Sequence, residues 1–184
     1  MRDYFFQQFL NHFWLRPENA LLLSLRAESY WRTLQYFKTN VGTIDVSCGD
    51  GVFSFITFGG QLSINTDMFR SIKLGERKGD FDAFDYFDQT YFVEIEKEPD
   101  RKYEYGLDWK RNLLDKASKL NFYSHLIEHD NNFPIPLPDE SMSFVYTNSA
   151  YWVQNFVGHL QDLVRITKKG GYIVLQIKTD KIKQ

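Results

Sequence analysis

The sequence lacks cysteine pairs, basic clusters and long apolar runs, and each absence excludes a class of protein. Cys48 is the one cysteine, so the chain cannot form an internal disulfide, which suits a reducing compartment. The chain has 22 basic and 24 acidic side chains and no lysine- or arginine-rich block, so it lacks the charge pattern of nucleic-acid binding. No apolar run approaches the roughly 18 residues of a membrane span, and the N-terminus lacks a continuous signal-peptide core. We therefore expect a soluble, cytoplasmic protein with no nucleic-acid partner and no membrane span.

The length of 184 residues allows one domain with a buried core, and aromatic side chains make up 17% of it. We expect a single domain over residues 1–184, with a helical lead over residues 1–40. The lead contains a helix from Glu18 to Phe37, because apolar residues recur there at three- to five-residue steps while Arg26, Glu28 and Arg32 fall between them. Residues 61–101 show no lasting period and are interpreted as an insertion of loops and short elements.

Strands and helices alternate through the rest of the chain. Strands are expected at residues 43–46, in a segment that ends at Asp108, and at residues 124–130, 142–149 and 172–178; helices are expected at residues 52–58, 110–120 and 154–167; residues 168–171 are expected to form a turn. This alternation implies crossover connections, and hence an α/β fold with a mostly parallel sheet of five strands and helices on both faces.

The stretch "TIDVSCGDGVF", residues 43–53, combines a short β-branched run, a turn of small residues and the start of a helix. A strand, a tight turn and a helix in this order bring backbone N–H groups and a helix N-terminus to one point. A ligand can lie there against bare backbone, because glycine leaves the approach open.

Five segments in this order resemble the class I S-adenosylmethionine-dependent methyltransferases. They are "DVSCGDG" at the turn, "YGLDWKRNLLDKASKL" at the second strand, "HDNNFPIPLPDES" in the loop before the fourth strand, "FVYTNSAYW" at its end, and "LVRITKKGGYIVL" at the fifth strand. The resemblance runs from about residue 43 to residue 178, with a gap over the insertion. It implies a Rossmann-like sheet and S-adenosyl-L-methionine as the cofactor.

The resemblance also implies which residues contact the cofactor. Asp108 is expected to hold the ribose hydroxyls, Asp130 the adenine amino group, and Asn148 to face the methyl donor. The alternatives are that Asp130 forms a plain Asx turn and that Asp108 is a helix-capping acid. The full set of expected cofactor contacts is Asp45, Ser47, Cys48, Gly49, Gly51, Asp108, Trp109, Asp130, Asn131 and Asn148.

Three departures from the family pattern stand out. Ser47 replaces the first glycine of the turn, which is tolerable if its φ stays negative. Met142 and Ser143 replace the usual aromatic–acid pair. The closing C-terminal hairpin of the family sheet is missing, which leaves an apolar fifth strand at the sheet's edge. We expect a truncated chain that self-associates through this edge.

Methyl transfer from a sulfonium is an in-line displacement that needs orientation more than acid–base help. No catalytic base can be assigned, and Tyr151 and Trp152 are expected to wall the pocket of a small-molecule or glycan-like acceptor. The Phe-, Tyr- and Asp-rich insertion, centred on residues 75–91, is expected to cover that acceptor. The alternative is an incomplete, non-catalytic binding module. An NAD-dependent oxidoreductase is disfavoured because the turn lacks the Gly-x-Gly-x-x-Gly spacing.

Other motifs favour no metal. "HLIEH", residues 125–129, matches a zinc-peptidase pattern by letters, but it occupies the place of a strand rather than a helix. The acids of residues 80–88 lack the glycine and terminal glutamate of a calcium loop. Cys48 is expected to be a small packing residue rather than a nucleophile.

Overall fold

Two helices open the chain, α1 (Arg2–His12) and α2 (Pro17–Leu34), and they pack against each other. The computed structural model describes residues 1–13, 16–37, 41–66, 85–87 and 89–177. Pro17 is the first residue of α2, where its missing N–H costs no helical hydrogen bond. The predicted helix is therefore confirmed, although it ends three residues before Phe37.

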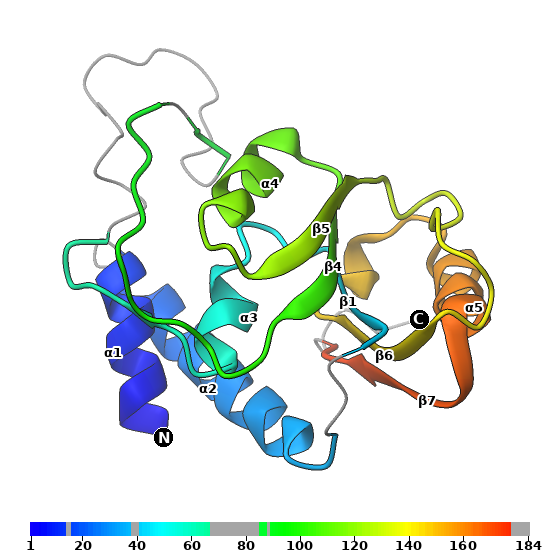
Figure 1. Cartoon of the computed structure of the whole chain (residues 1–184), viewed down its shortest axis with the longest axis horizontal. Coiled ribbons are helices and arrows are strands. Elements are labelled where there is room, and N and C mark those ends of the chain that lie inside the picture. The colour runs from blue at the N-terminus through cyan, green and yellow to red at the C-terminus, as the bar shows by residue number, and fades with distance from the viewer. Residues whose placement is uncertain (14–15, 38–40, 67–84, 88, 178–184) are drawn as a thin grey trace.

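A five-stranded parallel sheet forms the centre of the structure, in the order β5-β4-β1-β6-β7 (Figure 1). Its strands are β1 (Thr43–Val46), β4 (Tyr103–Asp108), β5 (Tyr123–Glu128), β6 (Met142–Thr147) and β7 (Thr167–Leu175). The predicted five strands and their parallel pairing are confirmed. Because all five run in one direction, the loops that follow β1, β4, β5 and β6 meet at one edge.

Helices cover both faces of the sheet, as the sequence predicted. The remaining helices are α3 (Val52–Thr57), α4 (Arg111–Ser118), α5 (Phe156–Ile166) and a 3-10 turn at Ala150–Trp152. Phe144 and Tyr146 of β6 pack into a core with α1, α2 and α3, whereas Val145, between them, packs against Leu163 of α5. This alternation places two cores on opposite faces, and Figure 1 shows α5 on the side away from α1 to α3.

Much of the aromatic content lies in the first of these cores. Tyr30 of α2 stacks on Tyr146 with ring centroids 3.8 Å apart, and its hydroxyl hydrogen-bonds that of Tyr103 on β4. These buried rings join α2 to the sheet.

A small antiparallel pair lies within the predicted insertion. It consists of β2 (Gln61–Leu62) and β3 (Ile95–Lys97). Residues 67–84 and 88, which include most of the segment expected to cover the acceptor, lie outside the described residues.

The last strand differs from its prediction at its start. A turn was expected at residues 168–171, but β7 begins at Thr167, which pairs with Met142, and Tyr172 then pairs with Phe144. The extra residues form an irregularity at Gly170, whose φ of +77° glycine tolerates. In the described part of the chain β7 is one of the two edge strands of this sheet, with β5 at the other edge, and its Ile173, Val174 and Leu175 are half-buried.

No helix among the described residues has the length and apolar character needed to cross a membrane.

Candidate functional site

The glycine turn after β1 lies at the edge where the parallel strands end. Gly49 and Gly51 have φ of +60° and +77°, the left-handed region that glycine adopts without strain. A Cβ added at Gly49 would meet nothing within 4 Å, so the space beside its backbone is open. A Cβ at Gly51 would lie 2.8 Å from the ring of Tyr123. The two glycines therefore meet different demands: Gly49 leaves a ligand approach open, and Gly51 makes room for a side chain of the core.

Ser47 does not meet the condition of a negative φ under which a serine in the turn would be unstrained. Its φ is +63°, which costs a non-glycine residue about 1 kcal/mol or more. The Asn131 side-chain amide donates a 2.7 Å hydrogen bond to Ser47 Oγ, so the turn after β1 is joined to the loop after β5. The serine hydroxyl thus supplies a contact that the family's glycine could not.

Asp108, the last residue of β4, also contacts the turn after β1 through a hydrogen bond from a backbone N–H group. Its Oδ2 accepts from the Gly49 N–H at 3.0 Å, and its Oδ1 accepts from the Lys110 N–H at 2.9 Å. The side chain is 5% exposed. Burial raises the pKa of this carboxyl, and the two backbone hydrogen bonds oppose that rise. Asp108 therefore contacts the start of α4 and also borders the open space beside the turn.

A cavity of about 600 Å³ lies at the ends of β1, β4, β5 and β6. Six of the expected residues line it: Ser47, Asp108, Trp109, Asp130, Asn131 and Trp152. Six lining residues were not anticipated: Lys110, Leu113, Asn132, Ser149, Val153 and Gln154. All six follow a strand end within seven residues, and that position is the signal that could have identified them.

Two buried polar atoms in this cavity lack a hydrogen-bond partner in the described structure, Asn131 Oδ1 and Ser149 Oγ. A buried polar atom without a partner is costly, so a ligand with N–H or O–H groups would satisfy them. These oxygen atoms, with the Asp108 carboxylate beside them, can accept hydrogen bonds from a ligand that carries hydroxyl and amino groups.

Asp130 forms the Asx turn that the sequence left open as an alternative. Its Oδ1 accepts from the Asn132 N–H at 2.9 Å and from the Asn132 side chain at 2.8 Å. Asp130 is exposed and still lines the cavity, and its Oδ2 takes no part in the turn.

Asp45 and Cys48 lie beneath the turn rather than in the cavity. Asp45 is 2% exposed and accepts hydrogen bonds from Ser54 Oγ at 2.5 Å and from Tyr123 OH at 2.9 Å. Burial raises the pKa of Asp45 to about 6, although both hydrogen bonds oppose the rise. Burial also raises the pKa of the Cys48 thiol, in keeping with a packing residue.

Asn148 and Tyr151 follow β6, and neither lines this cavity. The Asn148 carbonyl accepts a hydrogen bond at 3.3 Å from Arg26 of α2. Sequence reasoning treated Arg26 only as a polar position on its helix, because the pattern does not reveal that α2 crosses the ends of the strands.

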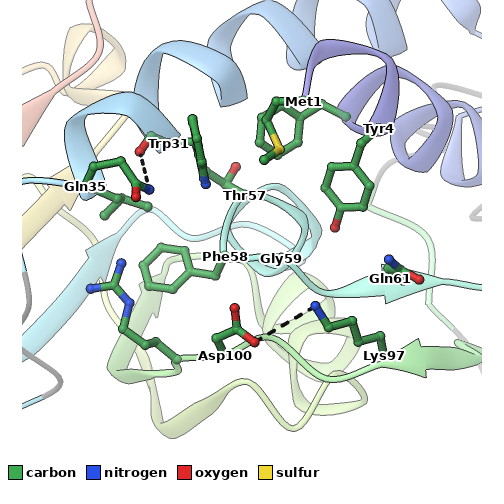
Figure 2. Close-up of a pocket in the computed structure, with 13 residues that line it drawn as sticks. Met1, Tyr4, Trp31, Gln35, Thr57, Phe58, Gly59, Gln61, Lys97 and Asp100 are labelled. Carbon is green, nitrogen blue, oxygen red and sulfur yellow. Dashed lines mark hydrogen bonds and ion pairs between the residues drawn. The ribbon is translucent and has the colours of Figure 1, made fainter.

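A second cavity, of about 540 Å³, lies at the far end of α3 and is lined by residues such as Tyr4, Trp31, Phe58 and Asp100 (Figure 2). Arg101 also lines it and precedes β4, so this cavity lies at the amino-terminal edge of the sheet. Ligands of open parallel sheets bind at the carboxyl edge, which favours the cavity beside the glycine turn.

No group of three His, Cys, Asp or Glu in the described part of the chain could hold a metal ion. His125 lies within β5, which confirms that "HLIEH" is not the helix that a zinc peptidase requires.

Part of the chain matches a known family, and its fold is similar to solved structures. Residues 91–175 match the family described as Methyltransferase domain. The chain is also similar to a structure from Thermotoga maritima described as an S-adenosylmethionine-dependent methyltransferase, possible histamine N-methyltransferase. That likeness has 16% identity and a TM-score of 0.51, and it covers 95% of this chain and 60% of that one.

Two further solved structures are similar. One is an S-adenosylmethionine-dependent methyltransferase, so described, from Methanococcus maripaludis (18% identity, 81% of this chain, 52% of that chain, TM-score 0.48). The other is phosphoethanolamine N-methyltransferase 1 of Haemonchus contortus, in complex with phosphoethanolamine and S-adenosylhomocysteine (15% identity, 85% and 28%, TM-score 0.49). The chain spans 60% or less of the length of each of these three structures. No curated protein matches it.

The match over residues 91–175 and the strand order support the Rossmann-like fold of a methyltransferase domain.

Proposed function

We propose that this protein transfers a methyl group from S-adenosylmethionine to a small-molecule or glycan-like acceptor. The observation that carries the proposal is the cavity at the strand ends, where open space beside Gly49 adjoins the buried carboxylate of Asp108 and the unpartnered atoms of Asn131 and Ser149. A nucleoside presents the donors that these groups lack.

The roles proposed for the lining residues follow from their chemistry. Asp108 accepts hydrogen bonds from the two ribose hydroxyls, because its lone pairs beyond the two backbone bonds remain available. Asp130 and Asn131 bind the edge of the base, and the exposed indole of Trp109, 64% accessible, packs against its face. Asp45 lies beneath the turn and supports it indirectly, because its hydrogen bonds with Ser54 and Tyr123 join β1 to α3 and β5.

When bound, the cofactor supplies an activated methyl group on a sulfonium. The chain's contribution is then to bind, orient and exclude water, and no side chain is assigned as a base. Trp152, which is 67% exposed at the cavity, and Tyr151, whose ring lies 5.4 Å from it between centroids, are proposed as walls of the acceptor site.

Calorimetric titration tests the proposal. S-adenosylmethionine and S-adenosylhomocysteine should bind with one-to-one stoichiometry, while NAD, titrated as the control nucleotide, should give no binding heat. Binding of NAD alone would overturn the proposal in favour of an oxidoreductase. Cofactor binding without methyl transfer to any acceptor in a panel of small amines, acids and sugars would favour the non-catalytic module.

A further inference from the structure

Arg26 of α2 places a guanidinium at the carboxyl end of β6, between that strand and the first turn of α3. One terminal nitrogen of Arg26 donates to the Asn148 carbonyl at 3.3 Å, and the guanidinium carbon lies 5.6 Å from the centre of the Phe53 ring. Asn148 directly follows the residue of β6 that pairs with Val46, the end of β1. Arg26 therefore lies beside the residues that flank the glycine turn.

The position of this guanidinium is set by the chain around it. The side-chain nitrogen of Gln176 donates to the Arg26 backbone carbonyl at 2.9 Å. The Tyr146 hydroxyl donates to Gln176 Oε1, the oxygen of the same side-chain amide, at 2.8 Å. Tyr146 is fully buried, and burial and the charge of Asp45 raise its pKa. The positive charge of Arg26 opposes this rise in pKa, which is consistent with a position near the Tyr146 hydroxyl. The helix bearing Arg26 is thus fixed over the strand ends.

The other cations near the turn already face carboxylates. Lys110 binds both oxygens of Asp85 at 2.7 and 2.8 Å. Lys116 is fully buried and acts electrostatically on Asp50, whose Oδ2 also lies 3.2 Å from His12 Nε2. Arg26, by contrast, forms no ion pair with any carboxylate in the described part of the chain. Its hydrogen bond to Asn148 is to a neutral carbonyl, which leaves most of the five guanidinium donors for a ligand.

The acids at this edge make such a cation necessary for a ligand that carries a carboxylate. Asp45, Asp50, Asp108 and Asp130 all lie in or beside the turn and would repel a second anion. We propose that Arg26 binds the carboxylate of the cofactor's amino acid tail. This inference rests on the proposed function and adds a residue to it, on a helix that the family match over residues 91–175 does not include.

The test compares two adenosine thioethers, one with the amino acid tail and one without it. S-adenosylhomocysteine carries the carboxylate, whereas 5′-methylthioadenosine keeps the adenosine and the thioether but has no amino acid tail. Their dissociation constants are measured by calorimetry for the wild-type protein, Arg26→Gln and Arg26→Lys. Arg32→Gln is the matched control, since Arg32 lies on the same helix, is 70% exposed and pairs with Glu28.

We expect Arg26→Gln to weaken S-adenosylhomocysteine binding about 10- to 100-fold, the effect of losing a hydrogen bond to a charged group, and to leave 5′-methylthioadenosine within about twofold. Arg26→Lys should retain part of the affinity, because it keeps the charge without the planar donors. Arg32→Gln should change neither constant.

Equal effects on both ligands, or no effect on either, would overturn the assignment of Arg26. Equal loss would mean that Arg26 only supports the fold, since a misfolded site would lose both ligands together. Failure of both ligands to bind the wild-type protein would instead overturn the proposed function, so the two failures are distinguishable.

Discussion

The carboxylate of Asp108 accepts a hydrogen bond from the Gly49 amide at 3.0 Å, and this contact joins the end of β4 to the turn after β1. Two residues 59 positions apart in the sequence thus form one edge of the cavity. Four predictions follow from this edge and the groups packed beneath it.

Asp108→Asn should weaken S-adenosylhomocysteine binding by about 1–3 kcal/mol, because the amide keeps the shape of the side chain but loses a charged acceptor. Calorimetry gives the affinity, and thermal unfolding should show that the variant remains folded. Asp139→Asn serves as the control, since Asp139 is 74% exposed and pairs with Arg165 away from the cavity. Unchanged affinity in a folded Asp108→Asn protein would remove Asp108 from the site.

Gly49→Ala should block cofactor binding, because the new Cβ occupies the open space beside the backbone. It should lower the free energy of unfolding by only about 1–2 kcal/mol, the strain of alanine in the left-handed region, because the Cβ meets no other atom of the protein. Gly170→Ala is the matched control, because Gly170 also has a positive φ (+77° against +60°) and open surroundings but lies at the irregularity in β7. Chemical denaturation should give similar losses of stability for the two variants. Only Gly49→Ala should lose S-adenosylhomocysteine.

Gly51→Ala should be the more destabilising change in the turn, by about 1–3 kcal/mol beyond Gly49→Ala, because its Cβ would overlap Tyr123 at 2.8 Å. Denaturation of the two variants side by side measures the difference. Equal stability would mean that the ring of Tyr123 moves aside without cost.

Asp45 should make the folded protein less stable as pH rises. Burial lifts its pKa to about 6, above the usual 3.8, so its contribution is fully present below pH 3.8 and is lost as pH rises through 6. The loss should amount to about 1–3 kcal/mol between these values. Asp45→Asn keeps an acceptor for Ser54 and Tyr123 and cannot titrate. The difference in unfolding free energy between wild type and Asp45→Asn should therefore change between pH 4 and pH 6, and a constant difference would contradict the buried-carboxyl account.

Local sequence patterns were sufficient for the sheet and for half of the cavity lining. Short runs bounded by turns located all five strands, and the resemblance to the methyltransferases located Ser47, Asp108 and Asn131 at or just after the ends of three of them. Position along a parallel sheet is enough for such residues, because the carboxyl ends of the strands lie together.

Features that depend on contacts between residues far apart in the chain could not be predicted from the sequence. The role of Asp45 depends on Tyr123, which is 78 residues away, and the demand for glycine at position 51 depends on the same ring. Arg26 reaches Asn148 across 122 residues, which a helical period cannot reveal. The sequence did not predict that β7 begins at Thr167. Residues 168–171 resemble an ordinary turn, but the irregularity at Gly170 lets Thr167 pair with Met142 within the strand. Self-association through β7 stays a prediction, as does the cytoplasmic location.

A crystal structure with S-adenosylhomocysteine tests the central claim most directly. The account predicts that the adenosine lies in the cavity beside the glycine turn, with the ribose hydroxyls at the Asp108 carboxylate and the base beside Asn131. Ligand bound instead in the second cavity, between Trp31, Phe58 and Asp100, or ribose hydroxyls directed away from Asp108, would contradict it.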